Sequence, residues 1–428
     1  MTAGAATVPT VDDVRAEVRA WLEGHWDPER PLVEWRGLLV DSGWACPSWP
    51  AEWYGRGLPA AMDAVVADEL TSIGAVGTPT GAGMGLAGPT ILAHGSDELR
   101  GRMLRPILTG ETTWCQLFSE PGSGSDLAGL TTRADRDGDE WTVNGQKVWT
   151  TSAHHADFGV LVARTNWDAP KHRGITYFVL PMRQAGVEVR PLRQMNGYSS
   201  FNEVFLTDVR VPADNVVGEV DGGWAVALAT LALERRGFAA PRAVRPVGGA
   251  PGRTVREAQA EADEYMKTYV WYPQRAGRAD LVVERARATG RSGDPVVRQK
   301  IAALLSMQRV AQWTAQRALA ARKLGRPPGP EGSLSKLSAS NIARAAAGVH
   351  TLVSGPSATL AGADSPMAGI ITEVLVSVPA VSIAGGTDEV QRNIIGEQVL
   401  GLPKEPQVDR DIPFRDVPKN TGREGRRP

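Results

Sequence analysis

The chain has 428 residues, and 47 basic against 48 acidic side chains give it a formal net charge of −1. This balance argues against a nucleic-acid-binding surface and against a basic face attracted to membranes. Two cysteines are too few for a disulfide framework or a four-ligand zinc site, so we expect a cytoplasmic protein. The longest apolar stretch, Val374 to Ala384, is far shorter than the roughly 20 residues of a membrane-spanning helix.

The N-terminal quarter of the chain has the spacing of amphipathic helices. Apolar side chains recur at helical intervals over residues 14–22 and again over 62–70. A loop rich in proline and glycine, residues 46–58, separates the two stripes. We therefore predict an N-terminal helical domain over residues 1–113.

Near Trp114 the hydrophobic period changes from 3.6 to 2. Short segments rich in β-branched and aromatic residues follow, and turn dipeptides separate them. Of these dipeptides, Asn144-Gly145 predicts a two-residue hairpin more strongly than Asp137-Gly138 does. Residues 114–221 are therefore predicted to form a mostly antiparallel β domain.

Helical periodicity returns after residue 221 and predicts a C-terminal helical bundle over 222–402. The final residues, 403–428, are charged and rich in proline, and we predict an extended or disordered tail. An α domain, a β domain and an α bundle in this order make an α+β multidomain protein and exclude a doubly wound sheet. The predicted helices of the bundle cover 224–240, 255–288, 296–324, 334–361 and 387–400.

One segment combines small residues with hydroxyl groups in a way that suits a ligand. Gly122, Ser123 and Gly124 let the backbone approach a ligand closely, while Ser119 and Ser125 supply hydroxyls. Such a loop can receive a flat hydrogen-bonding group or a phosphate. An ordinary turn between domains is the alternative interpretation.

Two further segments carry possible binding groups. Trp149 with the following threonines offers an aromatic face beside a hydroxyl, although a tryptophan in a strand is more often part of the core. Near the other end of the chain, Gly385-Gly386 precede Thr387, a predicted helix N-cap. The pair His154-His155 lacks the spacing of metal ligands, so no metal site is predicted.

Three motifs, in this order and spacing, resemble the acyl-CoA dehydrogenase family. They are Phe118-Ser-Glu-Pro-Gly-Ser-Gly-Ser-Asp126, Asn144-Gly-Gln-Lys-Val-Trp-Thr-Thr151 and Gly385-Gly-Thr-Asp-Glu-Val-Gln-Arg392. The resemblance covers about Val11 to Pro406. It implies a helical N-terminal domain, a middle β domain, a C-terminal four-helix bundle, and FAD bound with help from a neighbouring subunit.

The resemblance also implies roles for particular residues. Phe118 and Ser119 are expected to contact the isoalloxazine ring, and Gly124 and Ser125 to lie near the flavin or the pantetheine. The remaining expected cofactor contacts are Trp149 and Thr151 against the flavin ring and its N5 region, Thr387 and Glu389 from the capped helix, and either Arg287 or Arg291 at the pyrophosphate.

The catalytic base departs from the commonest pattern of the family. Many members have a glutamate where this chain has Gly385. A second branch, resembling isovaleryl-CoA and long-chain dehydrogenases, carries the base on the first bundle helix, and Leu231-Ala-Leu-Glu-Arg235 matches that context. Glu234 is therefore the expected base, held in an apolar pocket that raises its pKa. Gly385 is expected to polarise the thioester carbonyl through its backbone N–H.

The resemblance implies that Glu234 removes the α-proton of an acyl-CoA, that flavin N5 accepts the β-hydride, and that an electron-transfer flavoprotein takes the electrons. A homodimer or homotetramer is expected. Two alternatives stay open: a non-catalytic partner subunit of a heteromeric dehydrogenase, and a flavin monooxygenase or oxidase on the same fold. The sequence does not identify the acyl group.

Overall fold

The structure is a computed structural model that describes residues 9–234, 250–324, 329–407 and 409–418. The chain divides into two compact units. The first comprises residues 1–191, 201–268 and 409–428, and the second comprises residues 192–200 and 269–408. Within the described ranges, no helix is both long enough and apolar enough to cross a membrane.

Five helices open the first unit. The first of them begins at a capping box, in which the Thr10 side chain accepts a hydrogen bond from Asp13 N and the Asp13 carboxylate accepts one from Thr10 N. The helix buries Val14, Val18 and Leu22, the stripe that the sequence predicts. The five helices are α1 (Val11–His25), α2 (Leu32–Asp41), α3 (Met62–Ser72), α4 (Gly88–His94) and α5 (Asp97–Thr109).

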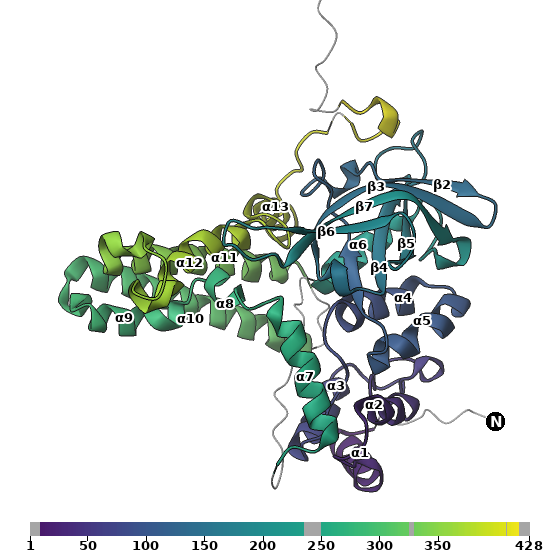
Figure 1. Ribbon diagram of the computed structural model, residues 1–428, viewed down its shortest axis with the longest axis horizontal. Helices are drawn as coiled ribbons and strands as arrows, with labels where there is room; N and C mark the ends of the chain where they lie inside the picture. The colour runs from purple at the N-terminus through teal and green to yellow at the C-terminus, as the bar shows by residue number, and fades with distance from the viewer. Residues whose placement is uncertain (1–8, 235–249, 325–328, 408, 419–428) are drawn as a thin grey trace, which may run out of the picture. The chain divides into compact units, whose positions relative to one another are not determined.

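A seven-stranded sheet forms the middle of the first unit (Figure 1). Its strand order is β1-β4-β2-β3-β7-β6, with β5 paired to β4. The pairs β2/β3, β3/β7 and β4/β5 are antiparallel, whereas β1 runs parallel to β4. The strands are β1 (Trp114–Leu117), β2 (Arg133–Asp137), β3 (Glu140–Thr151), β4 (Phe158–Arg164), β5 (Ile175–Pro181), β6 (Val187–Leu192) and β7 (Phe201–Pro212).

Both faces of the central strands are buried, and the side-chain alternation of a strand explains how. Along β4, Val160 and Val162 pack into a cluster with residues of α4 and α5. The alternate residues Leu161 and Ala163 pack into a second cluster formed by the sheet itself. Strands covered on both faces are apolar at nearly every position, as β4 and β5 are.

The predicted hairpin at Asn144-Gly145 is wrong. The β2/β3 hairpin lies at the other dipeptide, where Asp137 pairs with Glu140 across a two-residue loop and Gly138 has φ of 62°. Strand β3 continues through Asn144-Gly145, with a shift of register against β7 at that point. Strand β7 advances from 209 to 206 while β3 advances from 143 to 145, so the dipeptide lies opposite a bulge in β7.

Close packing explains why glycine stands opposite this bulge. A Cβ atom on Gly145 would lie 2.5 Å from Thr132 Oγ1 and 2.8 Å from Thr132 Cα. The neighbouring Asn144 locks the bulge, because its Oδ1 accepts from Asp208 N at 2.9 Å and its Nδ2 donates to Asp208 Oδ1 at 3.0 Å. Asn144-Gly145 has a high turn propensity, but here the dipeptide allows close packing between strands and does not reverse the chain.

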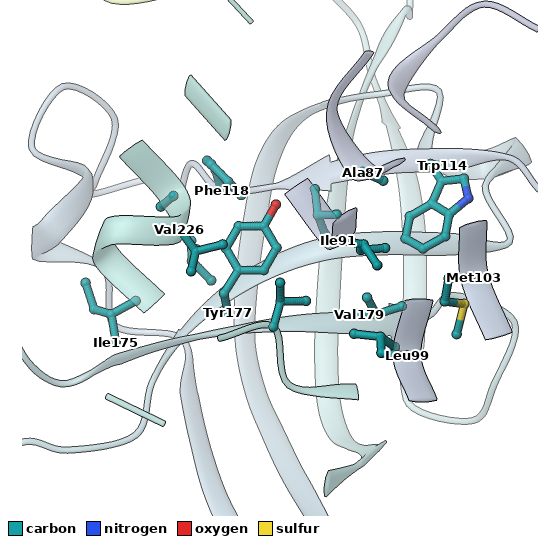
Figure 2. Packing of buried hydrophobic residues seen from close by; sticks show 14 of the residues in the cluster. Ala87, Ile91, Leu99, Met103, Trp114, Phe118, Ile175, Tyr177, Val179 and Val226 are labelled. Carbon is teal, nitrogen blue, oxygen red and sulfur yellow. The ribbon is translucent and has the colours of Figure 1, made fainter. Parts of the chain in front are cut away.

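Helices α6 (Gly223–Glu234) and α7 (Arg253–Lys267) complete the helical part of the first unit. Helix α6 packs against β5 and α4, and its buried residues include Val226 and Ala227. Figure 2 shows Val226 beside the Tyr177 ring, with Phe118 close to both. The close approach of α6 to β5 requires Gly223, since a Cβ there would lie 2.5 Å from Tyr177 N.

The second unit is helical, with α10 and α11 packed side by side (Figure 1). The helix predicted over 255–288 is broken into α7, α8 and α9, and the helix predicted over 334–361 ends at Ser354, before a glycine-proline pair. A helical N-terminal region, a middle sheet and a helical C-terminal region confirm the predicted α+β class. The remaining helices are α8 (Tyr272–Arg275), α9 (Val282–Ala288), α10 (Pro295–Lys323), α11 (Glu331–Ser354), α12 (Ile370–Ser377) and α13 (Asp388–Ile394).

Candidate active site

Strand β1 and the residues that follow it form the centre of the candidate site. Phe118 is buried and packs edge-on against Tyr177, with ring centroids 5.8 Å apart and planes at 89°. The flanking residues Gln116 and Ser119 are half-buried. The end of β1 therefore presents an amide and a hydroxyl beside an aromatic core.

Glu234 ends the described part of α6 and lies beside β1. Gln116 Nε2 donates to Glu234 Oε2 over 3.4 Å, and the glutamate is half-buried. The next residue, Arg235, lies outside the described residues. The carboxylate of the expected base thus stands at the same strand end as Phe118 and Ser119.

A buried hydroxyl network lies one helical turn before Glu234. Thr230 Oγ1 lies 3.1 Å from Tyr177 Oη and 3.1 Å from Thr90 Oγ1, and it donates to Val226 O. All three hydroxyl-bearing residues are almost completely inaccessible. Burial raises the pKa of Tyr177 despite the hydrogen bonds of its hydroxyl, so the phenol stays neutral. The network fixes the inner face of α6 against β5 and α4.

A buried ion pair joins the first two sequence motifs. Lys147 Nζ donates to Glu120 Oε1 at 2.9 Å and to the carbonyls of Phe118 and Val162. The Glu120 carboxylate also accepts the backbone N–H of Thr132. Burial opposes ionisation, but Lys147 and these hydrogen bonds outweigh it and lower the pKa of Glu120 to about 2. The sequence analysis did not single out either residue, although both lie inside the motifs.

Trp149 is held in an uncommon conformation and faces outward. Strand β3 advances from residue 147 to 150 while β7 advances only from 204 to 202, so β3 bulges there. Trp149 has φ of 62°, its side chain is 57% exposed, and its ring meets the Phe201 ring edge-on at 5.8 Å. An exposed indole on a strained backbone is a feature of functional sites more than of cores. The interpretation of Trp149 as a core residue is therefore wrong.

One backbone hydrogen bond brings the first two motifs together. Val148 N donates to Ser119 O over 2.9 Å, which sets the residue before Trp149 beside Ser119. Thr151 is half-buried at the end of β3, and the Thr150 hydroxyl before it is buried with no hydrogen-bond partner among the described residues. Phe118, Ser119, Trp149 and Thr151 therefore belong to one neighbourhood.

The loop of small residues is open on its outer side. A Cβ atom added to Gly122 or Gly124 would meet no atom within 4 Å among the described residues, and Ser125 is exposed. Ser123 is buried instead and donates to Asp126 O at 2.5 Å. Ser123 thus shapes the loop, and Gly124 and Ser125 remain available to a ligand.

The residues of this neighbourhood fit FAD. They combine the exposed indole of Trp149 with the hydroxyls of Ser119 and Ser125 and with an uncrowded glycine backbone. A flat ring with hydrogen-bonding edges needs an aromatic face and donors or acceptors at its rim. The orphaned hydroxyl of Thr150 is a further polar group within the same region.

The third motif lies in the second unit. Thr387 is the N-cap of α13, as predicted, and its hydroxyl accepts from Val390 N at 3.2 Å. Gln391 Nε2 donates to the carbonyl of Gly385 at 3.0 Å, and Gly385 has φ of 67° with open space where a Cβ would lie. Glu389 is exposed and accepts from Arg392. The Thr387 hydroxyl oxygen therefore already accepts the hydrogen bond that caps α13.

Asp388 anchors this motif to the neighbouring helix. Its buried carboxylate accepts from Lys336 Nζ at 3.1 Å and from Arg344 Nη1 at 2.6 Å. Burial opposes its ionisation, yet Ser340 and the two cations outweigh it and lower the pKa of Asp388 to about 2. The sequence does not reveal these contacts, because the cationic partners of Asp388 lie on α11.

The two arginines proposed for the pyrophosphate differ in their surroundings. Arg291 donates to Leu352 O at 2.9 Å and to Asp294 Oδ2 at 2.7 Å. Arg287 is exposed on α9. Because Arg291 is already engaged by these contacts, Arg287 is the better candidate to bind an external anion.

Two adjacent histidines lie in the loop after β3. The His154 and His155 rings lie 4.0 Å apart, and the described residues hold no cluster of three or more histidine, cysteine or acidic side chains suited to a metal ion. Cys46 and Cys115 are buried free thiols.

Some residues of the candidate site, Gln116 foremost, could not be found from the sequence. No local sequence pattern marks them, because their partners are distant in the sequence.

Comparisons with known proteins identify the family of the chain. The N-terminal, middle and C-terminal domains of acyl-CoA dehydrogenases match residues 9–111, 115–209 and 275–400. The chain is 33% identical over 419 residues to acyl-CoA dehydrogenase IpdE1 of Mycobacterium tuberculosis, covering 92% of this chain and 98% of that protein.

Solved structures with the same fold include two complexes. The ChsE4-ChsE5 complex from Mycobacterium tuberculosis contains a chain with 28% identity and a TM-score of 0.62, covering 94% of this chain and 100% of that one. A chain of the Tcur3481-Tcur3483 steroid ACAD has 26% identity and a TM-score of 0.62, covering 92% and 98%.

The fold and the three matched domains define an oxidoreductase of a flavoprotein family. The chain belongs to the acyl-CoA dehydrogenase family.

Proposed function

We propose that this protein catalyses the FAD-dependent α,β-dehydrogenation of an acyl-CoA thioester with Glu234 as the base. The observation that carries the proposal is the position of the Glu234 carboxylate, hydrogen-bonded to Gln116 at the strand end that also carries Phe118 and Ser119. FAD, when bound, supplies the acceptor for the hydrogen and electron pair that leave the β-carbon. The acyl-CoA and an electron-transfer flavoprotein are the proposed partners.

Glu234 takes the proton from the α-carbon in this mechanism. A base must be ionised and must be held within reach of the proton that it removes. Gln116 donates to one carboxylate oxygen, which orients the other, and the buried Thr230 network fixes the helix that carries the carboxylate. This chain has Gly385 where many family members have a glutamate, so that position supplies no competing carboxylate.

Gly385 is proposed to polarise the thioester carbonyl through its N–H. Gln391 holds the Gly385 carbonyl and so fixes the orientation of that part of the backbone. A fixed N–H donor stabilises the negative charge that develops on the carbonyl oxygen when the α-proton leaves. Phe118, Ser119, Gly124, Ser125, Trp149, Thr151, Thr387, Glu389 and one of Arg287 and Arg291 are proposed to hold FAD.

A bulky acyl group is the proposed substrate class. Glycine at position 385 leaves open space where the common family glutamate would stand. One solved relative is named a steroid ACAD, and we extend the class of large, branched or polycyclic acyl groups to this chain on that similarity. The carrier is proposed to be CoA.

Anaerobic mixing of the FAD-loaded protein with a panel of acyl-CoA thioesters tests the mechanism. The visible absorbance of oxidised flavin should bleach fastest with a bulky acyl chain, and Glu234→Gln should slow bleaching on the order of a hundredfold or more. The exposed Glu23→Gln provides a matched control and should bleach like the wild type. Bleaching by Glu234→Gln at the wild-type rate would rule out this base.

A heteromeric dehydrogenase, in which this chain is the non-catalytic partner subunit, is the second candidate. The names of two related structures, ChsE4-ChsE5 and Tcur3481-Tcur3483, each pair two different chains. In this case the protein purified alone is colourless, and it gains flavin and turnover only when co-expressed with a related subunit. A yellow homodimer or homotetramer with turnover would exclude this candidate.

A further inference from the structure

The C-terminal segment returns to the β domain and packs there. Phe414 is only 2% exposed, its backbone N–H donates to Ala169 O at 2.9 Å, and its ring lies 5.4 Å from the Trp167 ring. Arg415 N donates to Trp167 O at 3.0 Å. We call residues 409–417 the C-terminal strap. Part of the segment predicted as an extended or disordered tail is therefore anchored by a buried aromatic side chain.

The strap covers a buried arginine. The Arg164 guanidinium stacks on the Phe414 ring at 3.6 Å from its centroid, and Arg164 is fully buried. Burial lowers the pKa of Arg164 to about 10, so the side chain remains a cation at neutral pH. The face of an aromatic ring attracts a cation, most strongly where water is excluded. Phe414 therefore supplies both the attraction and the exclusion of water.

Arg164 in turn holds the loop of small residues. Its Nη2 donates to Ala128 O at 2.7 Å and its Nη1 donates to Lys171 O at 3.0 Å. We call residues 122–128 the cofactor loop, because Gly124 and Ser125 are its proposed FAD contacts. One buried side chain thus connects the strap to the end of the cofactor loop.

Lys171 makes a second connection. Its Nζ lies 3.2 Å from both carboxylate oxygens of Asp126 in the cofactor loop and 2.8 Å from Asp409 Oδ2 in the strap. Partial burial disfavours the charge of Lys171, but the hydrogen bonds to Asp409 and Asp126 outweigh it and raise its pKa. The lysine thus bridges two acidic side chains from segments far apart in the sequence.

We infer that the C-terminal strap positions the cofactor loop for FAD, through Lys171 to Asp126 and through Phe414 and Arg164 to Ala128. This inference rests on the proposed role of Gly124 and Ser125 in binding FAD. The loop needs such external support because its own glycines leave its backbone conformationally free. Holding it in the binding conformation before FAD arrives removes an ordering cost from binding.

Lys171→Met tests the lysine bridge in the full-length protein after removal and readdition of FAD. Hydrogen exchange in peptides that cover residues 119–132 should become faster, and the FAD dissociation constant should rise about fivefold, the effect of losing a salt bridge to the exposed Asp126. Lys171→Arg keeps the charge and should restore both values. Phe414→Leu keeps an apolar plug but removes the aromatic face, and should produce the same two changes.

Arg415→Ala is the matched control. Arg415 lies in the same strap and pairs with the exposed Asp168, away from the cofactor loop. Both measurements should match the wild type in this variant. The inference is overturned if Lys171→Met and Phe414→Leu behave like Arg415→Ala, and equally if the loop exchanges faster while FAD affinity is unchanged.

Gly124→Val separates failure of this inference from failure of the proposed cofactor site. Gly124 has open space around it among the described residues, so the protein should fold with valine there. Weaker FAD binding in Gly124→Val but not in Lys171→Met overturns the strap inference alone. Unchanged FAD binding in both variants removes the cofactor assignment of the loop and the inference with it.

Discussion

Glu120 shows how a single side chain connects two motifs that both carry proposed cofactor residues. Its carboxylate is bound by Lys147 from β3 and by the backbone N–H groups of Thr131 and Thr132, just before β2. Removing one member of such a buried pair leaves the other charge without a partner, which costs about 3–5 kcal/mol. The pair therefore constrains the backbone around Phe118 and Ser119, which are proposed flavin contacts.

The pH dependence of stability follows from Glu120. Its pKa is lowered from 4.5 to about 2 in the folded protein, so its stabilising contribution is complete above about pH 4.5 and is lost as the pH falls toward 2. We expect the free energy of unfolding, measured by urea titration, to fall between pH 5 and pH 3, and we expect Glu120→Gln to weaken that dependence. A variant with an unchanged pH dependence would contradict the assignment.

Trp149 shows what local backbone strain achieves at a proposed binding site. A tryptophan with φ near 60° is energetically unfavourable by itself, on the order of 1–3 kcal/mol. The surrounding ladder between β3 and β7 holds Trp149 in this backbone conformation. As a result, the indole departs from the regular side-chain alternation of the strand and is exposed. The regular strand that the sequence predicted here would not have exposed the ring in this way.

Strand β3 carries several residues that shape the candidate site. Along its ladder with β7, a bulge in β7 lies opposite Gly145 and a bulge in β3 lies at Trp149, and Lys147 stands between them. The bulge at Trp149 places its extra residue in β3, and such a bulge shifts the side-chain alternation of its own strand by one residue. The strand thus buries Lys147 and exposes Trp149 two residues later.

Substitution of Gly145 tests the importance of the first bulge. Gly145→Val places a side chain within 2.5 Å of Thr132, and we expect a loss of about 1–3 kcal/mol in the free energy of unfolding from this overpacking. Thermal or urea unfolding measures the loss. Gly101→Ala, in helix α5 with no atom near its Cβ position among the described residues, should be neutral or slightly stabilising. Equal stability of the two variants would contradict the packing argument.

The whole chain consists of two units, each with its own buried apolar clusters and its own buried acidic anchor. Glu120 is the anchor in the first unit, and Asp388 is the anchor in the second. Both tie a sequence motif of the family to a neighbouring element through buried or partly buried cations. The motifs therefore connect neighbouring elements and also carry the proposed ligand contacts.

Asp388→Asn should weaken the second unit. The substitution leaves Lys336 and Arg344 without their shared anion, and we expect a cost of about 2 kcal/mol, the usual value for hydrogen bonds to a charged group. Hydrogen exchange should accelerate most in peptides from α11 and α13 and least in peptides from β4 and β5. A uniform change across the chain, or none, would contradict this expectation.

Much of the architecture could be predicted, because hydrophobic periodicity reports which face of a helix or strand is buried. The stripe of α1 and the N-cap at Thr387 are examples, and both are confirmed. The hairpin at Asn144-Gly145 could not be predicted correctly, since a dipeptide with high turn propensity also suits a strand position opposite a bulge. The outcome was decided by contact with Thr132, which local sequence does not reveal.

The sequence alone determined the order of domains, the family motifs and the choice of Glu234 as the expected base. Only the tertiary structure brought Gln116 to Glu234 across 118 residues and Asp409 to Lys171 across 238. The physical reason is that periodicity and propensity act over a few residues, whereas these pairs depend on strand register and on which surfaces pack. Contacts of that kind exist only once the chain has folded.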